Sequence, residues 1–197
     1  MLHSWVPGAD GSGFSAEHLP YGVFAPASGE PVEQGEPGEP FRVGVRIGEH
    51  ILDLAALAQA GLVAGEPDDY ATDSLNPFMA AGPDRWRQVR EQLIDLTCDP
   101  AARDRVEAAL WPAHAATLAL PFQVADFVDF YSSRQHAENV GRIFRPDSPS
   151  LPAAWRHLPI GYHGRAGTVV VSGTDVVRPS GLRRVGDEVG YGSSWTS

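Results

Sequence analysis

The stretch FRVGVRIGEHILDL, residues 41–54, decides the fold of the first half of the chain. From Arg42 to Ile47, apolar residues alternate with polar or small ones, and this period of two is typical of a strand with one buried face. The preceding LPYGVFA, residues 19–25, is rich in the same β-branched and aromatic residue types. Two or three strands are therefore expected between residues 19 and 54.

Two helices are expected after these strands. Apolar residues recur at spacings of three and four between Pro83 and Leu96, with charged residues on the other face. A second helix is predicted to start at Asp99, with Pro100 as its first helical residue, and to run to Pro112. Two helices beside a small antiparallel sheet make an α+β unit.

The segment SGEPVEQGEPGEP, residues 28–40, separates the first expected strand from the second. It consists largely of Gly, Pro and Glu, so it has little apolar area to bury and no periodicity of a regular element. We expect a mobile, solvated loop.

Composition and charge exclude several classes of protein. The 197 residues are 43% apolar and 20% charged, which is enough to bury a core in one or two small domains and argues against simple disorder. The formal net charge of −10 would repel DNA or an anionic membrane. Neither nucleic acid nor membrane is expected as a partner.

The charge is divided unevenly along the chain. Residues 1–120 hold seven Arg against eighteen acidic residues, whereas residues 121–197 hold eight Arg against seven acidic residues. A change of this size at a Pro-containing segment suggests two domains, 1–120 and 121–197. An anionic ligand is therefore more favourable beside the second domain than beside the first.

The cellular compartment can also be inferred from the sequence. Cys98 is the single cysteine and cannot form an internal disulfide, which favours a reducing compartment. Residues 1–13 lack the basic and apolar regions of a secretory signal, and no uninterrupted apolar run reaches the roughly 18 residues of a membrane span. A cytoplasmic protein is expected.

Reactive side chains are densest in ADFVDFYSSRQHAENVGRIFRP, residues 125–146. If residues 127–131 form a strand, Asp129 and Tyr131 point to the same face. Ser132 followed by Gln135 fits a capping box that would start a helix running to about Phe144.

Within that expected helix, His136 lies on one face with Val140 and Phe144. This face is predicted to point inward, toward the strand that carries Asp129. Arg145 follows at the helix end, where a cation is favoured by the helix dipole. Each residue taken alone also has an ordinary structural explanation. Asp129 could be a turn residue, His136 a core residue and Arg145 a surface residue.

A second polar segment, LPAAWRHLPIGYHGRAGTVVVSG, occupies residues 151–173. Gly161 and Gly164 flank Tyr162 and a histidine, a pattern of a tight turn that presents side chains to a ligand, although a turn with solvated side chains explains it equally well. The apolar run at residues 169–171 predicts a buried strand after the turn.

These strings resemble the fumarylacetoacetase family. The resemblance is carried by DFYSSRQHAENVGRIFR (129–145) and LPIGYHGRAGTVVVSGT (158–174), with further matches in LPYGVF (19–24), GVRIGEHILDL (44–54) and LNPFMAAG (75–82). It implies a mainly β, α+β chain: an SH3-like barrel over residues 1–120, followed by the start of a mixed-β catalytic domain over residues 121–197.

The resemblance also implies an activity. The family hydrolyses a carbon–carbon bond of a 1,3-diketone acid, converting fumarylacetoacetate to fumarate and acetoacetate in tyrosine and phenylalanine catabolism. By matching position, His136 corresponds to the general base and Asp129 to a ligand of a Ca²⁺ or Mg²⁺ ion. Tyr131, Arg145 and Tyr162 correspond to substrate contacts, and the full-length family enzyme is expected to be a homodimer.

The resemblance breaks off at the end of the chain, in GYGSSWTS at residues 190–197. The family continues there into a strand rich in carboxylates, and its other metal ligands follow. One Asp cannot hold Ca²⁺ or Mg²⁺ tightly, because these ions take about six oxygen ligands. We therefore expect an incomplete, inactive catalytic domain and hypothesise that residues after about Tyr191 are out of frame.

Two other functions are compatible with the same residues. The chain could be a non-catalytic, SH3-like module that binds a protein partner, a remnant of an enzyme. It could instead belong to a related diketone hydrolase that acts on another acyl group.

Overall fold

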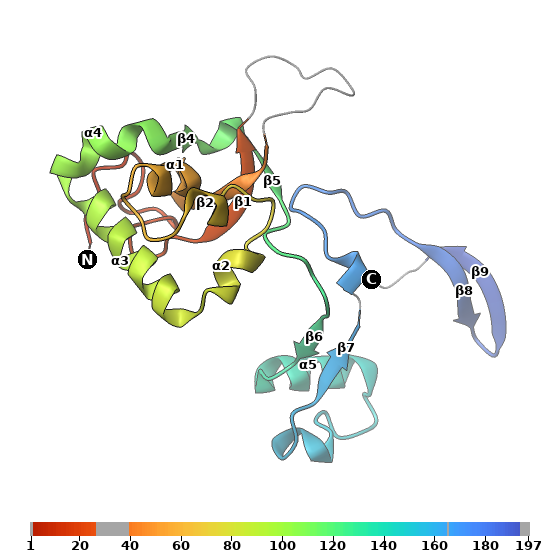
Figure 1. The fold of residues 1–197 in the computed structure, drawn as a ribbon. Coiled ribbons are helices and arrows are strands. Elements are labelled where there is room, and N and C mark those ends of the chain that lie inside the picture. The colour runs from red at the N-terminus through yellow and green to blue at the C-terminus, as the bar shows by residue number, and fades with distance from the viewer. Residues whose placement is uncertain (1, 27–39, 165, 194–197) are drawn as a thin grey trace.

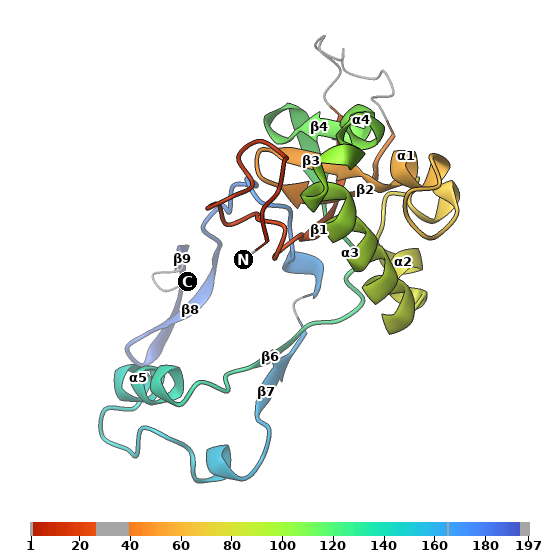
Figure 2. The same cartoon turned by 90° about the vertical axis from the view of Figure 1, so that its left-hand side faces the viewer.

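The computed structural model describes residues 2–26, 40–164 and 166–193. All but the last residue of the loop expected at 28–40 lies outside these ranges. Figures 1 and 2 show a compact first part, residues 2–119, and a second part, residues 121–193, whose elements are spread along an extended path. The names first part and second part are used below for these two ranges.

The first part is built on an antiparallel sheet with helices. Its strands are β1 (Tyr21–Pro26), β2 (Arg42–Ile47), β3 (His50–Asp53), β4 (Leu110–Pro112) and β5 (Ala116–Ala119). Its α-helices are α1 (Leu54–Gln59), α2 (Asn76–Ala80), α3 (Pro83–Cys98) and α4 (Arg103–Val106). The expected strands within residues 19–54 are thus confirmed, and the alternation of β2 buries Val43, Val45 and Ile47 completely.

The sheet has the strand order β4-β3-β2-β1-β5, and every pairing is antiparallel. In this order β4 and β5 are the two edges, so the strands form an open sheet within the described residues. The α+β, antiparallel character agrees with the sequence. The closed SH3-like barrel does not appear here and stays a prediction.

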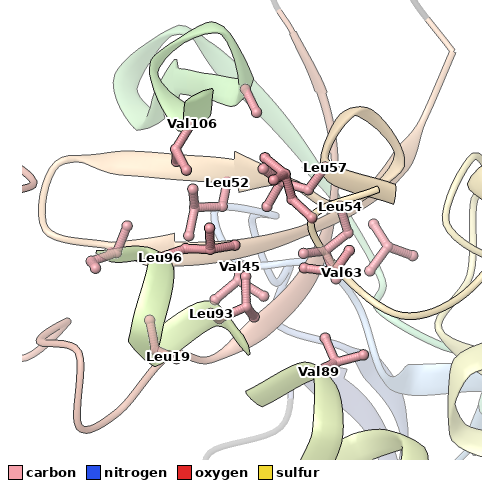
Figure 3. Close-up of a cluster of buried hydrophobic side chains, with 14 of the residues drawn as sticks. Leu19, Val45, Leu52, Leu54, Leu57, Val63, Val89, Leu93, Leu96 and Val106 are labelled. Carbon is pink, nitrogen blue, oxygen red and sulfur yellow. The ribbon is translucent and has the colours of Figure 1, made fainter. Parts of the chain in front are cut away.

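The core of the first part lies between the sheet and α3. Figure 3 shows Val45 and Leu52 of the sheet close to Leu93 and Leu96 of α3, with Leu54 and Leu57 of α1 beside them. The spacing of three and four residues places Val89, Leu93 and Leu96 on the buried face of α3 as predicted, while Trp86 stays 41% exposed. This cluster is the hydrophobic core of the first part.

The second predicted helix is only partly correct. Asp99 caps it and Pro100 is its first residue, as expected, since the Asp99 Oδ1 accepts the Ala101 N–H at 2.9 Å. The segment then breaks into 3₁₀ turns around the short α4, and Leu110–Pro112 form β4 instead of helix. Pairing with β3 explains the change, because the ladder hydrogen bonds of a strand replace those of a further helical turn.

The second part contains two separate two-stranded ribbons and one helix. The elements are β6 (Val128–Phe130), α5 (Arg134–Phe144), β7 (Gly161–His163), β8 (Ser180–Val185) and β9 (Glu188–Ser193). β6 pairs with β7 and β8 pairs with β9. The buried strand expected at residues 169–171 is wrong: these residues form no strand, and Val170 is 50% exposed.

Burial differs sharply between the two parts. Almost every buried apolar side chain belongs to the first part, and Ala137 is the exception in the second part among the described residues. The division at residue 120 agrees with this contrast but stays a prediction as a domain boundary. In the described ranges, no helix is both long and apolar enough to cross a bilayer.

Candidate functional site

The register of the β6–β7 ribbon brings the two polar motifs together. Asp129 of β6 is directly opposite Tyr162 of β7, between the pairs Val128–His163 and Phe130–Gly161. Directly opposite residues of an antiparallel pair point to the same face. Asp129 and Tyr162, which come from distant motifs, therefore share one face of the ribbon.

Tyr131 continues this face. It follows Asp129 at the spacing of two that places side chains on the same side of a strand, and its ring lies 5.9 Å from the ring of Tyr162, at an angle of 35°. A cleft of about 410 Å³ is lined by Phe127, Asp129, Tyr162, His163 and Gly164. The predicted sharing of a face by Asp129 and Tyr131 agrees with this geometry.

The ribbon also has a side-chain hydrogen bond, between His163 and Asp126, that the sequence did not reveal. His163 Nε2 lies 2.7 Å from Asp126 Oδ2, and Asp126 Oδ1 accepts the Phe127 N–H at 2.7 Å. These two hydrogen bonds, the backbone one first, lower the pKa of Asp126. Together with the Gly164 N–H donated to the Phe127 carbonyl, they join the start of β6 to the end of β7.

Helix α5 begins one residue later than predicted. Ser133, not Ser132, is the N-cap, and its Oγ accepts the His136 N–H at 3.4 Å. The Ser132 N–H and Oγ both donate to the Phe130 carbonyl in the turn after β6. The expected end at Phe144 is correct.

The predicted inward face of α5 is wrong. His136 is exposed, Val140 is half-buried and Phe144 is 72% exposed. The buried residues are Ala137 and Gly141. At Gly141 the absence of a side chain allows the Ser150 carbonyl to approach the helix backbone. His136 is therefore not among the residues that line the cleft.

Arg145 ends α5, as expected. Its backbone N–H donates to the Gly141 carbonyl, and its Nη2 donates to the Ser150 carbonyl at 3.4 Å. The guanidinium is exposed and is not part of the cleft lining. Of the five residues singled out from the sequence, the structure thus brings together Asp129, Tyr131 and Tyr162.

The residues of the cleft do not by themselves fit a divalent cation. Hard cations such as Ca²⁺ and Mg²⁺ require several oxygen ligands. Across residues 2–26, 40–164 and 166–193, no group of three or more His, Cys, Asp or Glu side chains is arranged to hold a metal ion. Among the described residues that line the cleft, Asp129 is the single carboxylate.

Known proteins show similarity along nearly the whole chain. Residues 17–121 match the family described as Fumarylacetoacetase N-terminal. The fumarylacetoacetase of Bos taurus is 42% identical over 192 residues, which are 93% of this chain and 44% of the bovine protein. The fumarylacetoacetases of Homo sapiens and Oryza sativa are 40% and 41% identical, over 93% and 91% of this chain and 44% and 43% of their own lengths.

The chain therefore spans less than half the length of the curated relatives that it matches. The matched region includes both the first part and the β6–β7 ribbon, since it covers more than nine-tenths of the chain. Because the family match covers residues 17–121, more than half of the chain, the chain belongs to the fumarylacetoacetase family, of which it represents the N-terminal portion.

Proposed function

We propose that this chain is the N-terminal portion of a hydrolase that cleaves a carbon–carbon bond of a 1,3-diketone acid, with fumarylacetoacetate as substrate and fumarate and acetoacetate as products. The observation that carries the proposal is the common face of Asp129, Tyr131 and Tyr162 in the β6–β7 ribbon. Hydrolysis places the hydroxyl of water on the attacked carbonyl carbon, which becomes a new carboxylate, and a proton on the departing carbon. The departing ketone keeps a carboxylate that the substrate already carried.

Each proposed role follows from the chemistry of the side chain. The imidazole of His136 accepts a proton from the attacking water, a contribution of about 10² to 10⁴ in rate for a positioned base. The phenols of Tyr131 and Tyr162 donate hydrogen bonds to keto or carboxylate oxygens, and the Arg145 guanidinium pairs with a carboxylate. All these groups act on oxygen atoms that gain or carry negative charge.

For His136 to act as the base at the cleft, α5 must move relative to the β6–β7 ribbon, or further polypeptide must complete the site. His136 lies on α5 and is exposed, whereas the cleft lies on the β6–β7 ribbon. Asp129 likewise supplies one carboxylate toward the metal on which the family depends. We propose that the remaining ligands of a Ca²⁺ or Mg²⁺ ion come from outside the described residues, and that the 197-residue chain by itself is inactive.

Activity is assayed as loss of the ultraviolet absorbance of the diketone, with the protein purified from its native extract. The intact mass of the same protein is also measured. A mass above 21.1 kDa identifies the chain as part of a longer product, which is then the enzyme to assay. Turnover is expected of it. Absence of turnover by that longer product, or a native mass of 21.1 kDa, would contradict the proposal and favour a non-catalytic, partner-binding remnant.

The base is tested by His136→Ala in the protein that turns over. We expect kcat to fall about 10²- to 10⁴-fold, while His114→Ala, which changes an exposed histidine of the first part, leaves kcat unchanged. Full activity of His136→Ala would exclude this histidine as the base. Turnover of a diketone with a different acyl group, but not of fumarylacetoacetate, would assign the chain to a related hydrolase.

Two further proposals concern the whole protein. We propose a homodimer, because the family's catalytic domains pair. We also propose a cytoplasmic location, because the single cysteine, Cys98, is a free thiol and reduced thiols are typical of that compartment.

A further inference from the structure

Trp155 connects two segments of the second part that lie far apart in the sequence. It is part of the 3₁₀ turn Ala153–Arg156, on the path from α5 to β7. Figure 1 shows this path as a wide loop that leaves α5 and returns to β7 beside β6. The indole Nε1–H of Trp155 donates to the carbonyl oxygen of Tyr131 at 3.1 Å, across 24 residues of sequence. Trp155 therefore contacts the backbone of a proposed substrate contact, although it is not itself one of these contacts.

The hydrogen bond forms where the chain leaves the β6–β7 ladder. The last pair of this ribbon is Phe130–Gly161, and Tyr131 is the next residue after β6. No residue of β7 is paired with Tyr131. Because the ladder ends before this residue, the direction of its backbone depends on contacts from outside the ladder, and the indole of Trp155 supplies one.

Trp155 and Tyr131 also line the same small hollow. Its volume is about 170 Å³, and its other lining residues are Phe130, Ser132 and the segment 158–160. The Trp155 side chain is half-buried. The indole thus lies against the junction between β6 and α5, where a change in its hydrogen bonding acts directly on the Tyr131 backbone.

The other end of the ribbon is held by separate contacts. His163 Nε2 lies 2.7 Å from Asp126 Oδ2, and the Gly164 N–H donates to the Phe127 carbonyl. The ladder between the two ends has three residue pairs, and isolated two-stranded ribbons are marginally stable in water. Side-chain hydrogen bonds at both ends therefore add constraints that so short a ladder lacks.

We propose that Trp155 is a positioning residue for Tyr131. The indole N–H holds the Tyr131 carbonyl and so fixes the direction in which the chain leaves β6. This direction sets the Tyr131 ring beside the Tyr162 ring, 5.9 Å away, and Tyr162 lines the cleft. The consequence for substrate binding rests on the proposed function, whereas the arrangement of the two rings is independent of it.

The first experiment measures the arrangement of the rings in the 197-residue chain without substrate. Trp155→Phe keeps an aromatic ring and removes the N–H donor. In NMR with labelled tyrosine, the wild type is expected to show a nuclear Overhauser effect between the Tyr131 and Tyr162 rings, and the variant is expected to lose most of it.

Trp86→Phe is the matched control. The Trp86 Nε1–H donates to the Phe78 carbonyl at 2.8 Å in the first part of the chain, so the substitution removes a hydrogen bond of the same kind at a distant place. We expect this variant to keep the contact between the Tyr131 and Tyr162 rings. Loss of the contact in both variants would indicate general destabilisation and would overturn a specific role of Trp155.

A further measurement requires no variant and decides the question if Trp155→Phe does not fold. In the wild type, the hydrogen-bonded Trp155 indole N–H is expected to exchange with solvent at least about tenfold more slowly than that of free tryptophan. Exchange as fast as in free tryptophan would overturn the proposal.

Kinetics test the link to substrate in the product that turns over. Trp155→Phe is expected to raise KM for fumarylacetoacetate about three- to tenfold, the effect of about one hydrogen bond, and to change kcat less than about twofold. In a Tyr131→Phe background the same substitution is expected to raise KM little further, because Trp155 acts through Tyr131. Trp86→Phe is expected to leave both constants unchanged.

The outcomes distinguish this inference from the proposed function. An unchanged ring contact in Trp155→Phe, or a rise in KM that is equally large in the Tyr131→Phe background, would overturn the positioning role. A ring contact that is lost in Trp155→Phe alone, in a protein that shows no turnover, would contradict the proposed activity and leave Trp155 established as the residue that positions Tyr131.

Discussion

Gly141 of α5 lies against the carbonyl oxygen of Ser150, so close that a Cβ atom on residue 141 would overlap that oxygen. The contact holds the segment after the helix on the helix backbone, and the same carbonyl accepts the Arg145 Nη2. The position of the Arg145 guanidinium therefore depends on the absence of a side chain at residue 141.

Gly141→Ala is expected to displace residue 150 and to destabilise α5 by about 1 to 3 kcal/mol, the usual cost of overpacking. Hydrogen exchange of the α5 amides measures the effect. Gly22→Ala is the control, because a Cβ at that position meets no atom within 4 Å. Equal protection of α5 in the Gly141→Ala variant and the wild type would contradict the close approach.

Gly48→Ala is expected to destabilise the first part more than Gly61→Ala. Both residues have a positive φ, +53° and +67°, which favours glycine. A Cβ at Gly48 would also lie 2.5 Å from the Pro7 carbonyl oxygen, whereas one at Gly61 would meet nothing within 4 Å. Chemical denaturation should show about 1 kcal/mol lost at Gly61 and more at Gly48, and equal losses would exclude the predicted overlap.

Asp53→Ala is expected to cost about 3 kcal/mol of the stability of the first part. The buried carboxylate caps α1 by accepting the Ala56 N–H at 3.1 Å, and its Oδ2 lies 3.3 Å from Arg42 Nη1. Loss of a cap and of one partner of a buried pair both destabilise. Denaturation followed by tryptophan fluorescence checks this, with the exposed Asp84→Ala expected to change stability by less than about 0.5 kcal/mol.

Tyr21→Phe and Tyr70→Phe should have opposite effects. The Tyr21 hydroxyl is buried and has no hydrogen-bond partner in the described structure, whereas the Tyr70 hydroxyl donates to the Ala64 carbonyl at 2.5 Å. Removing an unsatisfied hydroxyl is expected to be neutral or stabilising, and removing a bonded one to cost about 1 kcal/mol. The denaturation midpoints of the two variants measure these effects. A loss of stability in Tyr21→Phe comparable with that in Tyr70→Phe would contradict the absence of a hydrogen-bond partner for the Tyr21 hydroxyl.

The raised pKa of Tyr21 predicts a loss of stability at alkaline pH. Burial raises the pKa of Tyr21 from 10.0 to about 12, so the folded state retains this proton more tightly than the unfolded state. Its contribution to stability is complete below pH 10 and is lost as the pH rises from about 10 to 12. In denaturation at stepped pH, Tyr21→Phe should lose less stability across that interval than the wild type does.

His163→Gln is expected to raise the pKa of Asp126 toward its usual value of 3.8 without restoring it fully. The Phe127 N–H, the larger of the two causes of the lowered pKa, remains in the variant. A depressed carboxyl pKa stabilises the fold above the unfolded value, and this contribution is lost as the pH falls through the folded value.

Carbon-13 NMR of the Asp126 carboxyl group measures the shift. Asp10, whose pKa is lowered by the Ser4 backbone and by His3, serves as the control and should titrate identically in both proteins. An unchanged Asp126 titration in the variant would rule out the hydrogen bond with His163 as a cause of the lowered pKa.

The regular elements of the first part were predictable because their signals are local. Alternation from Arg42 to Ile47 fixes which side of β2 is buried, and the spacing of Val89, Leu93 and Leu96 fixes the buried face of α3. Asp99 and Pro100 mark a helix start by their own backbone chemistry. The change to a strand at Leu110 was missed because it depends on β3, a distant segment.

The candidate site was predictable in residue identity but not in arrangement. The strand pattern alone places Asp129 and Tyr131 on one face, and the family resemblance adds Tyr162. The sequence contains no signal for the Asp126–His163 pair, because it arises from the register of β6 against β7. The periodicity of α5 predicted an apolar inward face, but the helix packs through Ala137 and Gly141.

The sequence by itself determined the strands around residues 19–54, helix α3, the end of α5 and the family, because backbone propensity, periodicity and motif identity are properties of neighbouring residues. Tertiary structure alone decided that Asp129 faces Tyr162, that His136 is exposed and that β4 and β5 are sheet edges. These features depend on pairing between segments distant in sequence, where register and close backbone approach select one arrangement among those that the local pattern allows.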